Sequence, residues 1–132
     1  MNNKILLLLT SIALVSCVSV KVTKAPNIHG KLICIVNNPE VRSAFRDAYE
    51  RQLVSKGYAT KIVDTTSACD ITTTYTATYG FHWGMYLSTA VLTINDHGKE
   101  VGRADYSAPY ASPAKHGRVE GKIENLVAKL LP

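Results

Sequence analysis

Cys17 is the residue whose chemistry the neighbouring sequence indicates most clearly. It follows an apolar run, residues 5–15, that is broken only by Thr10 and Ser11, and Lys4 places a positive charge before that run. This order is typical of a secretory signal. A thiol at its end is the nucleophilic side chain that can carry a thioether-linked diacylglycerol. We therefore expect cleavage before Cys17 and acylation of its sulfur.

The residues around this cysteine favour the same chemistry. "LVSC", residues 14–17, resembles the lipobox of bacterial lipoproteins, in which small residues precede the cysteine that becomes lipidated. An ordinary cleaved signal with an incidental cysteine is the alternative. A membrane-spanning helix fits less well, because residues 5–20 would reach only about 24 Å across a hydrocarbon core of about 30 Å. Val18 follows the cysteine, and a residue other than aspartate at this place predicts sorting of a Gram-negative lipoprotein to the outer membrane.

Cys34 and Cys69 are expected to form a disulfide. Once Cys17 carries lipid, two cysteines remain in a compartment that oxidises thiols, and an even number there favours a pair. The bond would require the strand that contains Cys34 to lie beside the strand that follows Cys69, with the two Cα atoms within about 7 Å. Two buried free thiols are the alternative, since cysteine packs well as a small hydrophobic residue.

His82 and Trp83 are the best candidates for a surface binding site. They lie in "TYTATYGFHWGMY", residues 74–86. Neither an acid nor a thiol is near His82 in the sequence, so a surface histidine at a strand end is the favoured interpretation. The histidines at positions 29, 82, 97 and 116 lack the spacing of metal ligands. We therefore predict no catalytic residue, metal site or cofactor, and the chain contains none of the common catalytic motifs.

The composition is that of one ordinary globular domain. Apolar residues make up 46% of the 132 residues and charged residues 19%, with a formal net charge of +5. Basic and acidic side chains alternate over residues 42–51, as on a solvated helix face, so no nucleic-acid partner is expected. The expected partners are the membrane, through several acyl chains on Cys17, and an envelope protein, a cell-wall polymer or a lipid.

The elements that must position these residues begin with a strand and a helix. "KLICIV", residues 31–36, is a short β-branched run typical of a buried strand. Asn38, Pro39 and Glu40 then supply an N-cap, a first-turn proline and a first-turn acid, which predict the start of a helix. A lysine and a glycine at positions 56–57 predict its end.

Strict alternation of side-chain types predicts one long strand. From residue 71 to residue 83 the apolar and aromatic residues share one parity with Thr73, while the other threonines, Gly80 and His82 have the opposite parity. A period of two over this length indicates a strand with one apolar face. Phe81 is therefore expected in the core, and His82 on the opposite face. The aromatic stripe is interpreted as core rather than as a ligand cleft.

The remaining patterns complete an α+β fold. Residues 58–63, 86–94 and 99–106 are further strand candidates, and an apolar stripe over residues 119–130 predicts a final helix. The predicted order, βαββββα, gives a small sandwich: a mainly antiparallel sheet of about five strands with two helices on one face.

The chain is expected to divide into three parts. Residues 1–16 are the predicted lipoprotein signal peptide, residues 17–30 the lipidated N-terminus and a short tether, and residues 31–132 a single α+β domain. Ten extended tether residues would reach at most about 35 Å, so the domain is expected to work close to its membrane.

Four short motifs resemble one family. "ICIVNNPEV" (residues 33–41), "TYTA" (74–77), "MYLSTA" (85–90) and "GKEVGRADY" (98–106) are similar in order and spacing to the Sbal-type family of small proteobacterial lipoproteins. The resemblance implies the architecture and the envelope location, and no particular activity. That family often has W-x-W-D after its YTA, whereas residues 79–82 here are "YGFH", so a role that needs this acid is not expected.

Two functional classes follow from the sequence. The first is a non-enzymatic lipoprotein that binds or braces an envelope component at the periplasmic face of the outer membrane. The second is a small periplasmic enzyme whose site is assembled only in the fold. A pocket that joins His82 or His116 to an aspartate or glutamate would favour the enzyme.

Overall fold

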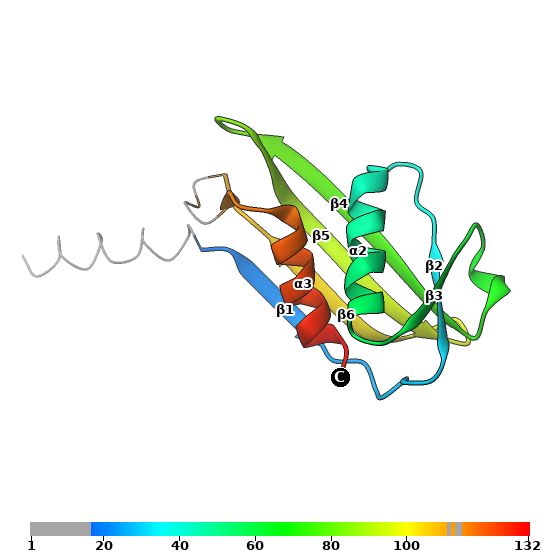
Figure 1. Ribbon diagram of the computed structural model, residues 1–132. Coiled ribbons are helices and arrows are strands. Elements are labelled where there is room, and N and C mark those ends of the chain that lie inside the picture. Colours follow the sequence, from blue (N-terminus) through cyan, green and yellow to red (C-terminus); the bar gives the residue numbers. More distant parts are fainter. Residues whose placement is uncertain (1–16, 111, 113–114) are drawn as a thin grey trace, which may run out of the picture.

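One mixed β-sheet carries two helices on a single face (Figure 1). The computed structural model describes residues 17–110, 112 and 115–132, so the predicted signal peptide, residues 1–16, lies outside the described residues. The sheet order is β1-β6-β5-β4-β2-β3. β2 is parallel to both of its neighbours, and every other pair is antiparallel. The predicted α+β class is confirmed, with six strands rather than about five.

The elements follow the predicted order, with one additional strand at the start. Their bounds are β1 Ser19–Thr23, β2 Leu32–Val36, α2 Ser43–Ser55, β3 Ala59–Val63, the short 3-10 helix η1 Thr66–Ala68, β4 Ile71–Phe81, β5 Met85–Asp96, β6 Lys99–Ser107 and α3 Val119–Leu130.

The predicted tether is wrong, because part of it is a strand. β1 pairs with β6 along its whole length, with Ser19 opposite Ser107. The chain then crosses to the helices, where Ala25 is buried and its backbone N–H donates to the Leu130 carbonyl at 2.8 Å. A Cβ at Gly102 would lie 2.7 Å from the Ala25 Cβ, so this crossing requires a glycine beneath it. The ordered domain therefore begins by residue 19 rather than at residue 31.

The core lies between the helices and the sheet. Phe45, Tyr49 and Leu53 from α2 are almost completely buried, as are four apolar residues of α3: Ile123, Leu126, Val127 and Leu130. The Tyr49 hydroxyl lies 2.6 Å from the Thr73 Oγ1 of β4, which satisfies both groups inside the core. Burial raises the pKa of Tyr49, so this phenol stays neutral.

Helix α2 begins later than its capping pattern predicts. Its N-cap is Arg42, and Asn38 lies in the preceding turn. There the Asn38 side chain accepts from the Glu40 backbone N–H at 3.1 Å and donates to the Tyr75 carbonyl at 3.1 Å. Asn38 thus joins the turn to β4 instead of starting the helix, and the predicted start is wrong by several residues.

The long strand β4 has the predicted face but not the predicted burial. Ile71 and Tyr75 are buried under the helices, whereas Phe81 is 72% exposed. The Arg42 guanidinium lies 4.7 Å from the centroid of the Tyr79 ring, which places the start of α2 at that level of the strand. The β4–β5 hairpin runs on beyond the helix, so the prediction that Phe81 lies in the core is wrong.

Within the described residues, none of the helices has the length and apolar character needed to cross a membrane.

Candidate functional site

Cys17 and the tip of the β4–β5 hairpin lie at the same end of the sheet. Pairing places Ser19, Ser107, Thr89 and Thr78 in one row across β1, β6, β5 and β4. β1 starts and β6 ends at this row, while the hairpin continues past it. Residues 108–110 and 115–118 and the start of α3 lie at this end as well (Figure 1). We call it the Cys17 end of the sheet.

Cys17 is exposed and forms no disulfide. A single residue, Val18, separates it from β1. Val18 also packs against the core cluster, so the ordered structure reaches almost to the sulfur. A group attached to Cys17 would therefore lie within about 7 Å of the first strand.

A tight turn closes the hairpin at His82, Trp83 and Gly84. The His82 backbone N–H donates to the Gly84 carbonyl at 2.9 Å. Trp83 has a φ of 59°, in the left-handed region that a bulky residue rarely adopts. Its side chain is 92% exposed, so the turn presents the indole to solvent. The structure thus places His82 and Trp83 together at the surface, in a turn just past the strand end.

His82 belongs to a cluster that sequence spacing did not reveal. The cluster consists of His82, Tyr86, Tyr110, Lys115 and His116. The Lys115 Nζ lies 2.5 Å from the His82 Nδ1, 4.3 Å from the centroid of the Tyr110 ring and 5.0 Å from that of Tyr86. It also donates to the Tyr110 carbonyl. Lys115 is only 2% exposed, so its ammonium group is enclosed by aromatic rings and the imidazole.

The aromatic members of this cluster pack on one another. The His82 ring lies 4.6 Å from the Tyr110 ring and 6.2 Å from the His116 ring, measured between centroids. His116 meets Tyr86 edge-on at 5.8 Å. Tyr110 and His116 thereby pack against the base of the hairpin tip.

The cluster is positively charged and has no carboxylate partner among the described residues. No aspartate or glutamate in that part of the chain forms an ion pair with Lys115 or with Lys122, whose Nζ donates to the Lys115 carbonyl. Burial lowers the pKa of Lys122. The pKa of His82 is also lowered, by partial burial first and then by the charges of Lys115 and His116.

Because Lys115 is buried, the cluster supports the hairpin from behind, and its exposed Tyr110 ring can pack against an apolar surface. In a Ser-His-Asp type of site a carboxylate orients the histidine, and here the group that contacts His82 is a lysine. Across residues 17–110, 112 and 115–132, no group of three or more His, Cys, Asp or Glu side chains is arranged to hold a metal ion.

Acidification should destabilise the fold through His82. Because its folded pKa lies below the ordinary value of 6.5, the unfolded chain binds more protons between these two values, and stability falls as pH falls through this window. We expect the decrease in Tm between about pH 7 and about pH 5 to be smaller in His82→Gln than in the wild type. Thermal unfolding followed by circular dichroism measures both slopes. Identical slopes would show that His82 is not perturbed.

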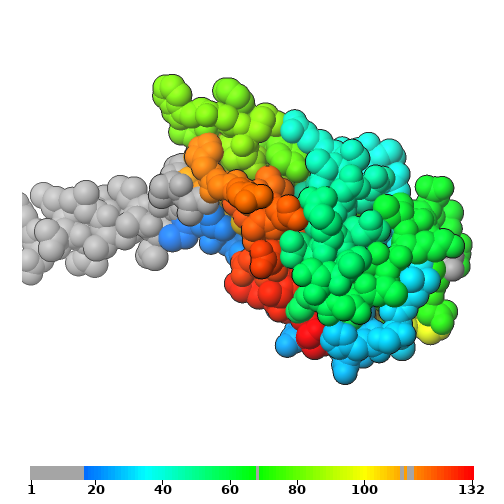
Figure 2. Space-filling model, in the orientation of Figure 1, coloured from blue at the N-terminus to red at the C-terminus, as the bar shows by residue number. Residues whose placement is uncertain are grey.

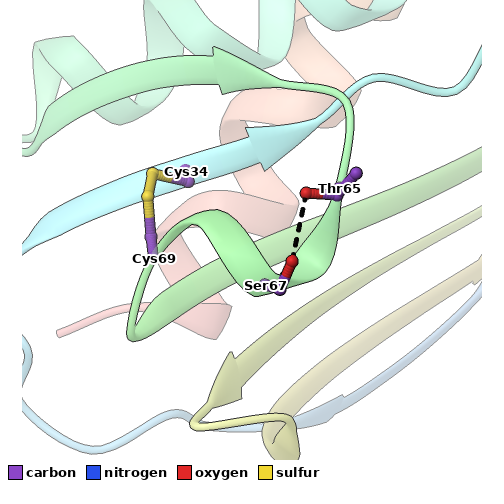
Figure 3. The surroundings of a disulfide bond; sticks show 4 residues. All are labelled: Cys34, Thr65, Ser67 and Cys69. Atoms are coloured by element: carbon purple, nitrogen blue, oxygen red, sulfur yellow. Dashed lines mark hydrogen bonds between the residues drawn. A yellow bond between two sulfur atoms is a disulfide. The ribbon is translucent and has the colours of Figure 1, made fainter.

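The disulfide lies near the opposite end of the sheet. Cys34 in β2 is joined to Cys69, with their Cα atoms 6.1 Å apart (Figure 3). Ile33 and Ile35 point toward the helices, so Cys34 points to the other face, where residues 64–70 return from β3 to β4. The bond thus fastens this connection over β2. The pair that the sequence predicts is the pair that the structure joins.

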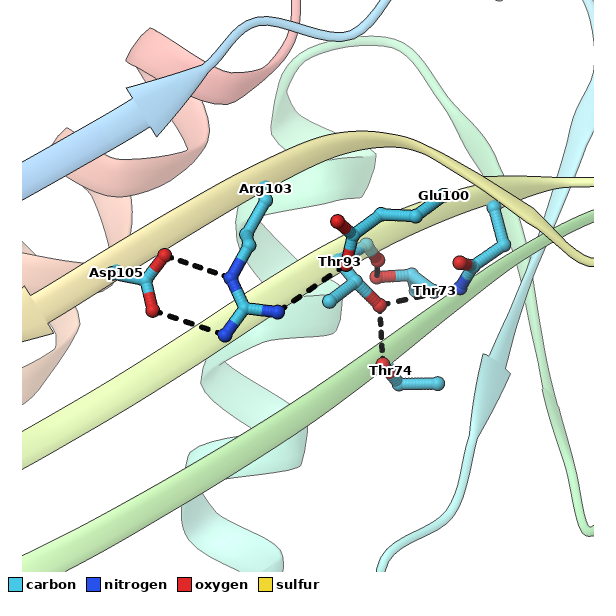
Figure 4. Close-up of polar contacts among 7 residues, drawn as sticks. Thr73, Thr74, Thr93, Glu100, Arg103 and Asp105 are labelled. Carbon is cyan, nitrogen blue, oxygen red and sulfur yellow. Dashed lines mark hydrogen bonds and ion pairs between the residues drawn. The ribbon is translucent and has the colours of Figure 1, made fainter.

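The sheet face opposite the helices carries polar side chains that are already paired (Figure 4). Arg103 donates to both carboxylate oxygens of Asp105, at 2.9 and 3.2 Å, and Glu100 lies 3.4 Å from the same guanidinium. Thr74 and Thr93 are hydrogen-bonded across β4 and β5 through their hydroxyls. The charge of Arg103 on this face is balanced by neighbouring carboxylates, whereas Lys115 in the cluster has no such partner among the described residues.

Sequence reasoning identified His82 and missed Lys115, Tyr86 and Tyr110. Lys115 lies 33 residues from His82 in the chain, so no local spacing connects the two. One signal could have suggested the cluster. Residues 77–95 and 106–119 both lack aspartate and glutamate, although the second stretch contains Lys115 and Arg118.

Comparisons with known proteins leave the family undetermined. No family model matches the chain, and no curated protein matches it. Among solved structures it is similar to the crystal structure of a PDZ domain protein from Parabacteroides distasonis ATCC 8503, with a TM-score of 0.42 and 12% identity over 89% of this chain. The match spans 37% of that protein's chain. The resemblance to Sbal-type lipoproteins therefore stays a prediction.

Proposed function

We propose that this protein is a lipid-anchored envelope lipoprotein on the periplasmic face of the outer membrane, where it acts as a non-enzymatic binding or assembly module. The observation that carries the proposal is Cys17, which one serine separates from an apolar signal-like run. The alternative to acylation, an incidental cysteine after an ordinary signal, would leave a reactive thiol on an exported protein.

The surroundings of Cys17 support this proposal. The thiol is exposed, and it stands one residue before β1 at an end of the sheet. An acylating enzyme could reach it without unfolding the domain. Because no long tether follows, the anchored domain would lie against the bilayer rather than tens of ångströms away.

The disulfide supports export. Structural disulfides persist in oxidising compartments such as the bacterial periplasm and are rare in the cytosol. Cys34 is fully buried at the bond, as expected for a structural rather than a catalytic disulfide.

A small periplasmic enzyme is the second candidate, and the contact between Lys115 and His82 is the observation that favours it. The ring contacts of His82 are with Tyr110, Trp83 and His116, together with Lys115. The carboxylate that the enzyme hypothesis requires is not among these contacts, so we assign no reaction to the cluster. A binding role needs only an exposed surface and a rigid support for it.

Acylation of Cys17 is the test of the proposed function. Mass spectrometry of the mature N-terminus should show Cys17 as the first residue, carrying diacylglycerol and an amide-linked acyl chain. Cys17→Ala should abolish the acyl mass and leave the precursor uncleaved, because the modified sulfur is lost. Fractionation of the envelope should place the wild type in the outer membrane. A free N-terminus at any other residue would contradict the proposal.

A further inference from the structure

The hairpin tip exposes an unusual concentration of apolar surface. Phe81, Trp83 and Met85 are 72%, 92% and 50% exposed, and they lie within five consecutive residues. We call these three residues the aromatic tip. Single exposed apolar residues are ordinary, but a contiguous group at a projecting point indicates a surface that becomes covered. Figure 2 shows the tip, in light green, projecting past the body of the molecule.

The tip is supported on one side by folded structure. A Cβ at Gly80 would lie 2.5 Å from the Tyr86 ring, so Tyr86 packs directly over the glycine on the neighbouring strand. His82 is held by Lys115 and Tyr110. A β-bulge at Ser88 is fixed by the Ala108 N–H, which donates to the Ser88 carbonyl at 2.8 Å. The aromatic tip is therefore preorganised, which reduces the entropy lost when it binds.

The tip projects in the direction in which the chain leads to Cys17. Beyond the row that contains Ser19 and Thr78, the hairpin continues for three paired residues, or about 10 Å. Cys17 extends at most about 7 Å past the same row. With strands spaced about 4.8 Å apart, the tip lies on the order of 10–15 Å to the side of the anchor. A bilayer that holds the acyl chains of Cys17 would meet the tip.

The charge around the tip is mainly positive, because Glu120, which lines a groove with Met85, is paired with Arg51. In the sequence, residues 77–95, which contain the tip, and residues 106–119 contain no aspartate or glutamate. The exposed basic group is Arg118, which lines a groove together with Val18, the residue next to the anchor. Lys115 is buried and contributes its charge from behind the tip. Basic groups near a membrane attract anionic headgroups.

We infer that the aromatic tip inserts into the headgroup region of the membrane that carries the anchor, with Trp83 at the interface. This inference rests on the proposed function. Tryptophan favours that depth because its ring is apolar while its N–H can reach water or a headgroup. The anchor and the tip together form two attachments, which fix the orientation of the domain on the bilayer.

Fluorescence provides a direct test, because Trp83 is the single tryptophan of the chain. The protein is purified from the membranes of cells that express the full chain and is reconstituted in vesicles of phosphatidylethanolamine and phosphatidylglycerol. We expect the emission of Trp83 to shift to shorter wavelength than in lipid-free buffer, and lipids brominated near the headgroup to quench it. Vesicles of phosphatidylcholine should give a smaller shift.

Two variants distinguish insertion of the aromatic tip from nonspecific adsorption of the protein to vesicles. Phe81→Ser combined with Met85→Ser leaves the reporter in place and should lower the ratio of inserted to free tip about tenfold or more, the factor expected for one buried phenylalanine side chain. Val54→Ser is the matched control, because Val54 is 54% exposed near the far end of α2. It should behave as the wild type.

The outcomes separate this inference from the proposed function. Trp83 emission typical of water in an acylated, vesicle-bound protein would overturn the inference and leave the proposed function intact. The same result with an envelope protein crosslinked at position 83 would assign the tip to that partner instead. If Cys17 carries no acyl group, the purified chain is mixed with the same vesicles. A blue shift of the Trp83 emission would then support insertion without the anchor. No blue shift would overturn the inference.

Discussion

Replacing Cys34 and Cys69 together with alanine is expected to lower the free energy of unfolding by about 3–4 kcal/mol. The bond closes a loop across a sequence separation of 35 residues, and it restricts the unfolded chain accordingly. Its loss also frees residues 64–70 from the face of β2. Urea denaturation of the wild type and the double variant measures the difference, which is a large share of the stability of a domain of this size.

A reducing agent gives the control for this prediction. Dithiothreitol should destabilise the wild type by a similar amount and leave the double variant unchanged. The state of the thiols is checked separately, by labelling the denatured, unreduced protein. Reactive thiols at both Cys34 and Cys69 would rule the bond out.

The two phenylalanines of the chain should differ strongly in their contribution to stability. Phe45→Ala is expected to cost about 3–5 kcal/mol, because Phe45 is 1% exposed and packs on Tyr75 at a ring distance of 5.9 Å. Phe81→Ala should change the free energy of unfolding by less than about 0.5 kcal/mol in buffer, because this side chain is 72% exposed. Parity alone predicted that Phe81 is a core residue.

This pair is an internal comparison, since the same side chain is truncated in both variants. Urea titrations with equal m-values would make the two free energies directly comparable. A cost for Phe81→Ala close to that for Phe45→Ala would mean that the hairpin tip folds back onto the body of the domain.

Much of the fold could be predicted because its signals are local. Alternation marks β4, and the apolar stripe of α3 contains the same residues that the structure buries. The chain has three cysteines, and assigning Cys17 to lipid left the two that the structure joins. Each of these patterns lies within one element or follows from residue counts.

The incorrect predictions concern features that depend on contacts between residues far apart in the sequence. Asn38 has the right type for an N-cap, but its amide is engaged by Tyr75, 37 residues away. Alternation gave the correct face for Phe81, yet burial depends on where α2 begins, and no pattern within β4 contains that information. Residues 19–23 are too short a strand to recognise without β6 beside them.

The candidate site divides in the same way. His82 and Trp83 were visible as a polar and an aromatic residue between two glycines. Lys115 was not, because it reaches His82 only when the part of the chain around Lys115 folds against the hairpin. A buried lysine without a carboxylate is also contrary to the usual expectation that charged side chains lie in solvent or in ion pairs.

The pairing of β1 with β6 determines when this domain can finish folding. Paired residues of these two strands are 80 to 88 positions apart in the sequence. Closing so long a loop is entropically costly and slow, so β1 should be among the last elements to dock. Until then β6 presents an open edge, which is the part of a sheet most prone to pair with another chain. Because β1, the first strand of the chain, must wait for β6, the last, we expect aggregation of this protein to begin at β6.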